Sequence, residues 1–354
     1  MKKNILITGA SGYVGAMLCD ILLNSPEVGM VIGIDKENID PLIKSHKNKD
    51  KFIFVHRNLA DKAWMDEMKK FNIDIVIHTA WQIREMYGKK SLQWAWNVDG
   101  SDNVFDFVFK SNIAKLVHFS TVASYGAFST NSISHFYQED EDFRKTDYLY
   151  AEEKRIAEVH LEDKYRHAAT HGYDGQVVVI RPAAITGPRG RIGRVRFGLQ
   201  SALSGTLKTE KSFIYDVISF MVSFVPVTKN WLRQFVHEDD IANIVIMSAM
   251  DKMKNNYEVF NVSPPGEVVL GPDMAKAVNK RTVRISPHLI RIAFFFMWHI
   301  SHGKVPTSRG AWKGYSYPIA VDGSKVTKTL GYHYKWNSKD AFTKLEGRYS
   351  EMYR

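Results

Sequence analysis

Cysteine is almost absent from this chain of 354 residues, which contains only Cys19. No disulfide can form within the chain, so the disulfide-stapled folds of small secreted proteins are excluded. Cys19 lies in an apolar segment, residues 16–22, and we expect it in the core of a first helix. A strand-like segment, residues 4–7, directly follows Met1, so we expect no cleavable signal peptide and a cytoplasmic location.

Long apolar runs are also missing. The most apolar stretch, residues 289–300, is interrupted by Arg291 and is well short of the ~20 residues that a membrane-spanning helix requires. We expect it to be a packed helix of a smaller lobe, with an interfacial membrane contact or a hydrophobic substrate entrance as open alternatives. Residues 212–227, broken by Asp216, are interpreted in the same way. The sequence therefore predicts no transmembrane segment.

No single basic stripe runs through the chain, although its net charge is +10. A positive balance favours acidic partners, which include nucleic acid, anionic membranes and phosphorylated small molecules. The lysines are scattered, as in residues 44–51 and 62–70, without the interleaved aromatics of a nucleic-acid groove. We therefore interpret most of the excess positive charge as solvated surface and expect no nucleic acid. Among the acidic partners, we expect an anionic small-molecule substrate.

Internal repeats and low-complexity tracts are absent as well, and the composition is that of a compact globular protein. Short β-branched or aromatic runs alternate with longer amphipathic segments. These runs are residues 4–7, 31–34, 52–55, 73–78, 115–120 and 177–181. The alternation predicts an α/β fold with a doubly wound parallel sheet of the Rossmann type, covered by helices on both faces.

The residue pattern changes after Pro182: irregular sequence with glycine and arginine is followed by apolar helical segments. A strand-like run at residues 257–262 suggests that the chain then returns to the sheet. We expect a Rossmann domain over residues 1–182 with returning segments at about 235–262, and a smaller, interleaved C-terminal substrate lobe over residues 183–234 and 263–354.

Three glycines, Gly9, Gly12 and Gly15, follow the first predicted strand and open an apolar helix. Glycine at this spacing lets the backbone approach a pyrophosphate, while the helix N-terminus supplies donors and a positive dipole end. Asp35 ends the second predicted strand, at the expected remove of ~20 residues. Its carboxylate can bind both ribose hydroxyls and would repel a 2′-phosphate, so NAD is favoured over NADP, although Lys36 beside it argues the other way.

Tyr150 and Lys154 lie one helical turn apart in a predicted helix, so their side chains share one face. Such a pair also occurs on ordinary surfaces. Upstream, however, Ser120 and Thr121 lie at the end of a predicted strand, at the edge where a parallel sheet has its active crevice. The combination favours a catalytic group of Thr121, Tyr150 and Lys154.

With these motifs, the chain resembles the extended short-chain dehydrogenase/reductases, specifically the NAD-dependent epimerase/dehydratase family, over nearly its whole length. The matching segments are the glycine loop, Asp35, Asn58-Leu59, residues 77–80, residues 97–101, Ser120-Thr121, Tyr150 with Lys154, Arg181-Pro182, Gly187-Pro188 and residues 235–242. The resemblance implies that Tyr150 is the acid/base, that Lys154 lowers its pKa and holds the nicotinamide ribose, and that Thr121 orients the substrate.

The resemblance also implies a set of cofactor-binding residues and no metal site. The set is Gly9, Ser11, Gly12, Tyr13, Val14, Gly15, Asp35, Asn58, Leu59, Thr79, Ala80, Trp81, Asn97, Ser120, Tyr150, Lys154 and Pro182. Asn58 stands where the family usually has an Asp that holds the adenine amino group, and its amide keeps an acceptor. His237 and Asp240 are expected to hold the fold rather than to catalyse.

Two features bear on the substrate in opposite directions. Ala184 stands where the sugar-nucleotide enzymes commonly have a phosphate-binding Asn. Arg233 stands where they have a pyrophosphate-binding Arg, and a loop before it is rich in arginine. The expected substrate-binding residues are Thr121, Ala184, Arg189, Arg191 and Arg233. A solvated edge for the loop arginines, including Arg194 and Arg196, and an ion pair of Arg233 with Glu238 or Asp239 remain open.

Two enzymatic functions remain open, and we favour the first. A nucleotide-sugar epimerase or dehydratase, similar to a UDP-sugar epimerase, would oxidise the sugar and return the hydride. A hydroxysteroid-dehydrogenase-like or carbonyl-reducing enzyme would take an apolar substrate against Ala183, Ala184 and residues 294–298. A non-catalytic NAD-sensing protein is disfavoured because the catalytic group is intact.

The helices expected to begin near Asn97 and Tyr150 have apolar residues on more than one side. In the family, these helices pair between subunits in a four-helix bundle. The resemblance therefore implies a homodimer.

Overall fold

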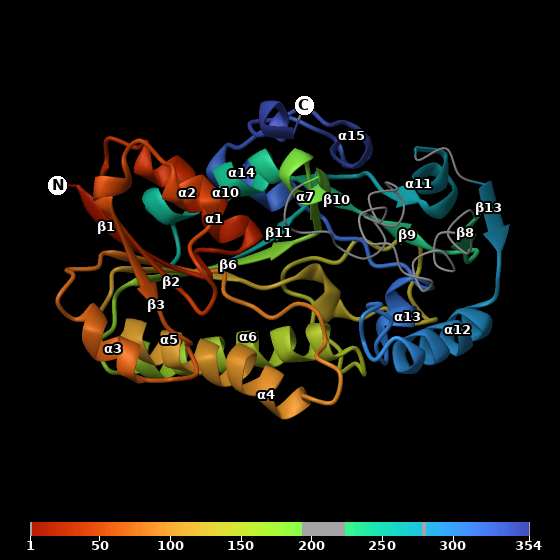
Figure 1. Cartoon of the computed structure of the whole chain (residues 1–354), viewed down its shortest axis with the longest axis horizontal. Helices are drawn as coiled ribbons and strands as arrows, with labels where there is room; N and C mark the ends of the chain where they lie inside the picture. The colour runs from red at the N-terminus through yellow and green to blue at the C-terminus, as the bar shows by residue number, and fades with distance from the viewer. Residues whose placement is uncertain (1, 193–223, 278–280, 354) are drawn as a thin grey trace.

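The computed structural model describes residues 2–192, 224–277 and 281–353 (Figure 1). Its centre is a seven-stranded sheet in the order β11-β6-β5-β4-β1-β2-β3, in which every neighbouring pair is parallel. The strands are β1 (Lys3–Thr8), β2 (Val28–Asp35), β3 (Phe52–His56), β4 (Ile75–His78), β5 (Lys115–Phe119), β6 (Gln176–Pro182) and β11 (Tyr257–Val262). The predicted doubly wound parallel sheet is confirmed. Its order reverses between β1 and β4, which is where such sheets bind ligands.

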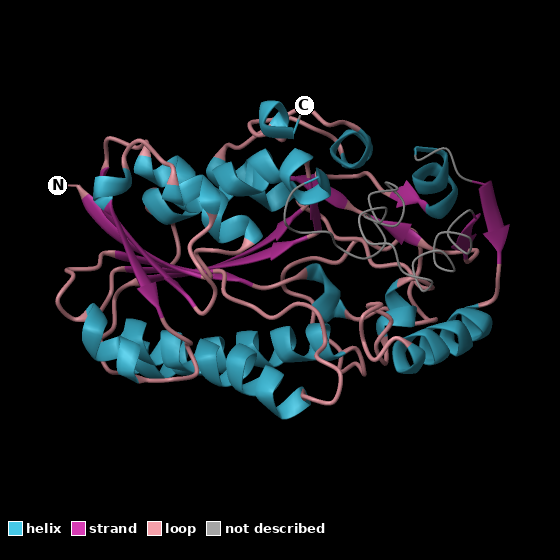
Figure 2. Cartoon of the chain, viewed as in Figure 1, coloured by secondary structure: helices cyan, strands magenta, loops and turns pink. Residues whose placement is uncertain are grey.

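Helices cover both faces of the sheet (Figures 1 and 2). On one face lie α1 (Tyr13–Leu23), α2 (Pro41–Lys44), α10 (Glu238–Met250) and α14 (Ser324–Leu330); on the other lie α3 (Ala63–Met68), α4 (Lys90–Trp94), α5 (Gly100–Lys110) and α6 (Leu149–Thr170). Ile5 and Ile7 of β1 pack in the core under α1 and α10, while Leu6 packs with Trp64 and Phe105 under the other layer. Because both faces are buried, the strands are continuous apolar runs, as parallel strands usually are.

Beyond β6 the chain leaves the sheet and then returns to it. The outgoing part contains β7 (Ala184–Thr186), α7 (Pro188–Ile192), β8 (Phe224–Val227), β9 (Leu232–Arg233) and β10 (Phe235–His237). After β11 come β12 (Val269–Leu270), α11 (Gly271–Ala277), β13 (Arg281–Arg284), α12 (Pro287–Ile300), α13 (Ala311–Gly314) and α15 (Ser338–Thr343). Strand β10 pairs with β7 within the outgoing part, whereas β12 pairs with β9 and β13 with β8 across the two parts, so the two parts are interleaved. Most of the predicted apolar segment 212–227 lies outside the described residues.

Polar contacts attach the C-terminal segment to α10. The Asp240 carboxylate accepts hydrogen bonds from the Tyr332 hydroxyl at 2.6 Å and from the Lys335 backbone N–H at 3.0 Å. His237 accepts from the Asp239 backbone N–H at 3.1 Å, and its ring stacks on Trp336 with 3.7 Å between centroids. These contacts agree with the fold-holding roles expected for His237 and Asp240.

Cys19 is fully buried in α1, in the core. No helix in residues 2–192, 224–277 or 281–353 is long and apolar enough to cross a bilayer.

Candidate active site

A cavity of about 820 Å³ lies at the carboxyl edge of the sheet, over the point where the strand order reverses. Its walls come from the loop after β1, the ends of β2, β4 and β5, the start of α6, and the segment 310–319. Every residue that the sequence predicts to bind the cofactor lines this one cavity, and so do Thr121, Ala184 and Arg233. The fold therefore brings together side chains that are more than 200 positions apart in the sequence.

The glycine loop has no room for side chains. Gly9 has a φ of +72°, and a Cβ there would lie 2.6 Å from the backbone of Ala80. A Cβ on Gly15 would lie 2.1 Å from the Gly9 carbonyl oxygen. Helix α1 begins at Tyr13 with Gly12 as its N-cap, and no side chain caps its first N–H groups. These donors and the positive helix end suit a pyrophosphate.

One buried polar side chain in this loop lacks a hydrogen-bond partner among the described residues. The Ser11 hydroxyl has no hydrogen-bond partner among the described residues, although it is buried and belongs to the cavity wall. Buried hydroxyls are rarely left without a partner. The loop, the uncapped helix and this hydroxyl together fit the diphosphate of a dinucleotide.

Asp35 shapes the adjoining part of the cavity. Its carboxylate accepts hydrogen bonds at 2.9 Å from the backbone N–H groups of Ser11 and Glu37. Burial raises the pKa of Asp35, and these hydrogen bonds act in the opposite direction. The two nearby cations already have carboxylate partners, since Lys36 pairs with Glu37 at 2.7 Å and Arg57 with Glu67 at 2.7 Å. This arrangement favours NAD over NADP, because neither Lys36 nor Arg57 offers an unpaired charge to a 2′-phosphate.

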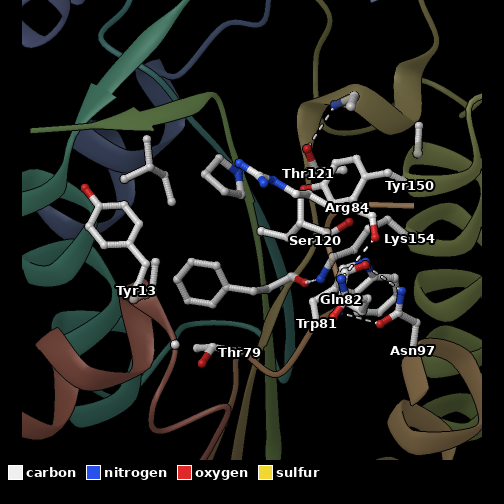
Figure 3. Close-up of a pocket in the computed structure, with 18 of the residues that line it drawn as sticks. Tyr13, Thr79, Trp81, Gln82, Arg84, Asn97, Ser120, Thr121, Tyr150 and Lys154 are labelled. Atoms are coloured by element: carbon white, nitrogen blue, oxygen red, sulfur yellow. Dashed lines mark hydrogen bonds between the residues drawn. The ribbon is translucent and has the colours of Figure 1, made fainter. Parts of the chain in front are cut away.

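The predicted catalytic side chains lie on one wall of the cavity (Figure 3). Thr121 directly follows β5, and its hydroxyl lies close enough to the phenol of Tyr150, in the first turn of α6, to act against the rise of that phenol's pKa. One turn later, the ammonium of Lys154 donates a hydrogen bond to the Phe119 carbonyl and lies 3.8 Å from the centroid of the Trp81 ring. The end of β5 and the start of α6 thus hold the three groups side by side.

Burial controls the protonation of this wall. It lowers the pKa of Lys154 to about 7, although the charges of Glu158 and Glu153 act in the opposite direction. It raises the pKa of Tyr150, against the hydrogen bond from Thr121. At neutral pH the phenol of the ligand-free chain therefore holds its proton and can act as an acid, next to an amine that titrates near neutrality.

Asn97 supports the wall from behind. It lies in a π-helical turn (Ala95–Asp99) between α4 and α5, the kind of distortion often found at functional sites. Its amide exchanges two hydrogen bonds with the backbone of Gln82, at 2.7 and 3.0 Å, and donates to Glu153 at 2.7 Å. Asn97 lines the cavity, but its amide is used to fix the segment after β4 against α6.

The other end of the cavity is aromatic and cationic. Arg233 donates a hydrogen bond to the Gly314 carbonyl at 3.1 Å, and its guanidinium lies 5.1 Å from the centroid of the Tyr315 ring. Lys313 pairs with Asp147 at 2.6 Å. Tyr148 and Tyr317 complete this end. Among the described residues, the ion pairs include none between Arg233 and Glu238 or Asp239, the alternative that the sequence left open.

Arg189 is a correction to the predicted substrate residues. It is absent from the cavity wall, and its guanidinium pairs with the buried Asp40 at 2.9 Å. Glu238 accepts hydrogen bonds from the backbone N–H groups of Arg189 and Gly190 at 3.0 and 3.1 Å, which fixes this helix end. Arg189 therefore holds α7 to the loop before α2. The Arg191 side chain, Arg194 and Arg196 lie outside the described residues.

Sequence reasoning missed the wall formed by residues 310–319 and by Tyr148. Gly310 has a φ of +82°, and a Cβ there would lie 2.4 Å from the Tyr148 backbone nitrogen. The segment can run against the start of α6 only because this residue is glycine. The contact spans about half of the chain, and no short motif marks it. The closely spaced Lys313, Tyr315 and Tyr317 were the only signal.

Comparison with known proteins identifies the family. A model described as the NAD dependent epimerase/dehydratase family matches residues 5–263. The chain belongs to this family. The predicted class, an extended short-chain dehydrogenase/reductase enzyme, is confirmed, as is NAD as its cofactor.

Individual relatives are distant. The UDP-glucose 4-epimerase of Mycolicibacterium smegmatis is 29% identical over 59% of this chain and 65% of its own length. The N-acetyl-α-D-glucosaminyl-diphospho-ditrans,octacis-undecaprenol 4-epimerase of Escherichia coli O157:H7 is 28% identical over 54% of this chain and 51% of its own length. A UDP-glucose 4-epimerase of Thermotoga maritima, solved with UDP-glucose, superimposes with a TM-score of 0.68 at 20% identity and covers 96% of both chains. At 20% identity, the similarity to the Thermotoga maritima structure shows a shared fold and no more.

The substitution Gly15→Ala tests the glycine loop. Its methyl group would collide with the Gly9 carbonyl, so we expect NAD to bind at least about tenfold more weakly. The measurement is isothermal titration of NAD into both proteins, with circular dichroism to compare their folding. Gly314→Ala is the matched control, since its added Cβ would find only the Arg233 guanidinium at 3.7 Å. Unchanged NAD affinity of Gly15→Ala would contradict the assignment.

The pH dependence of stability tests the burial of Lys154. Its folded-state pKa of about 7 lies below the usual ~10.4, so the unfolded state binds more protons between these values. The free energy of unfolding should rise with pH from about 7 to 10, by up to ~1.4 kcal/mol per unit. Lys154→Met should lack this rise, while Lys164→Met, on the outside of α6, should keep it. Urea denaturation without NAD measures both, and equal slopes for Lys154→Met and wild type would count against the assignment.

Proposed function

We propose that this protein epimerises or dehydrates a sugar carried on a diphosphate, most simply a UDP-type nucleotide sugar. The reaction is a reversible hydride transfer at a carbon that bears a hydroxyl. The observation that carries the proposal is the position of Tyr150 and Thr121 between two ends of one cavity. One end has the dinucleotide loop, and the other has Arg233 with its tyrosines.

Bound NAD supplies the hydride acceptor and, once reduced, the donor of the same hydride. The residues that would hold it are the glycine loop, Ser11 and Asp35, and Lys154 would hold its nicotinamide ribose. Thr121 orients the substrate hydroxyl by a hydrogen bond. The phenolate of Tyr150, which the positive charge of the bound oxidised cofactor would favour, takes the proton of that hydroxyl when the carbon gives up its hydride and returns the proton when the hydride comes back, so no net oxidation results. Acid/base catalysis of this kind contributes roughly 10²–10⁴-fold in rate.

The far end of the cavity suits the rest of such a substrate. The guanidinium of Arg233 presents a fork of donors that matches diphosphate oxygens. Tyr148, Tyr315 and Tyr317 offer flat faces for a sugar or a base. Both curated relatives named above act, by their names, on a sugar attached to a diphosphate. Ala184, also in the wall, has no polar group to add.

The apolar-substrate alternative loses part of its predicted wall. Residues 294–298 are absent from the lining of this cavity, and Phe295 and Phe296 are 59% and 57% exposed on α12. Ala183 and Ala184 do line it. The polar and cationic far end therefore favours the sugar diphosphate.

The two ends of the cavity support a division of the chain into two parts. We propose that residues 1–182 and about 235–262 form the NAD-binding domain. Residues 183–234 and 263–354 form the substrate-binding lobe, supported by the cavity residues Arg233, Lys313 and Tyr315. The cytoplasm stays the predicted compartment, supported by the single, buried thiol of Cys19.

Tyr150→Phe tests the mechanism. We expect turnover to fall by roughly 10²–10⁴-fold, because the acid/base is lost, while NAD affinity stays within about threefold. Tyr165→Phe, on the same helix but away from the cavity, should retain full activity. The measurement incubates each protein with NAD and UDP-sugars, and separately with hydroxysteroids, and follows both products and reduced nicotinamide.

Isomerised or dehydrated sugar without free reduced nicotinamide is the expected result. Stoichiometric release of reduced nicotinamide with a hydroxysteroid would support the alternative function instead. Full activity of Tyr150→Phe would show that another residue is the acid/base.

We also propose a homodimer through the outer faces of α5 and α6. Val159 is 42% exposed there, and Ile156 and Phe109 are half-buried. Sedimentation velocity should show a species of twice the 40.5 kDa chain mass. Val159→Asp should convert it to a monomer, whereas Ile133→Asp, on an exposed loop elsewhere, should not. A monomeric wild type at micromolar concentration would refute the dimer.

A further inference from the structure

Helix α12 is packed on one side only. Ile290 and Trp298 face the protein and are 3% and 8% exposed. The outward side is also apolar, and its large residues are Leu289 (55% exposed), Ile292 (41%), Phe295 (59%), Phe296 (57%) and Ile300 (70%). A surface helix normally turns polar residues outward, so an outward apolar side marks a contact with something else. We call these five residues the α12 face.

The stretch of chain that contains the α12 face is strongly positive. Between Asp273 and Asp322 the sequence contains eight Lys or Arg residues and no Asp or Glu, so this stretch supplies most of the net +10. Its exposed cations in the described structure include Arg281, Arg284, Arg291, Lys304 and Arg309. The ion pairs found between described residues involve none of these five. An apolar face in such a setting matches a partner that is apolar inside and anionic at its surface.

The α12 face adjoins the substrate end of the cavity. On the inner side of α12, the Phe294 ring lies 5.1 Å from that of Tyr315, a cavity residue. Tyr87 packs on Trp298 at 5.5 Å, and its hydroxyl lies 3.1 Å from the Nδ1 of His299. The chain just before Tyr87, at Ile83 and Arg84, lines the cavity. Figure 1 shows α12 beside α13, which forms part of the same wall.

We propose that the α12 face docks onto an anionic lipid surface. The phenylalanines and aliphatic side chains would lie at the boundary of headgroups and acyl chains, and the surrounding arginines and lysines would contact the anionic headgroups. At 14 residues the helix is too short to span a bilayer and would lie in its plane. This contact would place the substrate end of the cavity next to the membrane surface.

A second copy of the chain fits the α12 face less well. A two-fold interface brings the same patch of both subunits together. The arginines and lysines around one face would then meet those around the other, without carboxylates from this stretch between them. Like charges in such an interface are repulsive, whereas anionic headgroups neutralise them.

Vesicle binding by the full-length chain tests the proposal without any turnover assay, so its outcome is independent of the proposed function. The probes are vesicles of phosphatidylcholine and vesicles of equimolar phosphatidylcholine and phosphatidylglycerol, separated by flotation. We expect binding to the phosphatidylglycerol vesicles, weakened by added salt, and little binding to phosphatidylcholine alone.

Two variants locate the contact. Phe296→Ser combined with Ile300→Ser should weaken binding by about tenfold or more, because both apolar side chains leave the bilayer. Arg281→Gln combined with Arg284→Gln should weaken it by about fivefold per charge. Ile133→Ser removes an equally exposed apolar side chain (54%) elsewhere and should change nothing. Unchanged NAD affinity shows that each variant is folded.

Three results would overturn the proposal. The first is a wild-type chain that fails to float with the phosphatidylglycerol vesicles. The second is wild-type affinity in both the apolar and the arginine variants. The third is a loss of self-association in the Phe296→Ser/Ile300→Ser protein with unchanged vesicle binding, which would make the α12 face an interface between copies.

Discussion

A buried ammonium group organises this molecule. Lys154 is 3% exposed, and a charge so far from water is costly unless other groups replace its hydration. The Phe119 carbonyl and the face of the Trp81 ring do so in part, since burial still lowers the pKa of Lys154 to about 7. These groups come from the end of β5 and the segment after β4, so the charge is satisfied only when both strand ends and α6 are in place. The chemistry and the packing therefore depend on the same three elements.

The layer beneath the ammonium is kept neutral. His78 and His118 stack with 5.3 Å between their ring centroids, directly under the site. Burial lowers the pKa of His78 to about 3 and that of His118 well below its usual range, and the charge of Lys154 lowers both further. The two ring nitrogens of His78 form hydrogen bonds with the hydroxyls of Thr8 and Ser101, and these bonds join β1 and β4 to α5. The uncharged imidazoles therefore add no positive charge beside Lys154.

The parts of the site that could be predicted are those coded by short stretches of sequence. The glycine loop, Asp35, and the pair Tyr150 and Lys154 each need only a strand or a helix of the right type, and the sheet then brings them together. Side chains whose partner is far along the chain could not be placed. Arg189 donates a hydrogen bond to Asp40, which lies 149 positions away in the sequence, and the Gly310 segment packs against the start of α6. Asn97 was placed at the site, but its use of Gln82 and Glu153 depends on a π-helical turn that no residue pattern announces.

The position of the 310–319 wall has a consequence for biosynthesis. The glycine loop leaves the ribosome some three hundred residues before Gly310, and strand β11 closes the sheet only after the first six strands are complete. The residues that bind the dinucleotide are thus synthesised long before those of the aromatic and cationic wall opposite. Domains commonly fold in this order during synthesis. The cofactor half is therefore available as a template on which the late, interleaved half assembles.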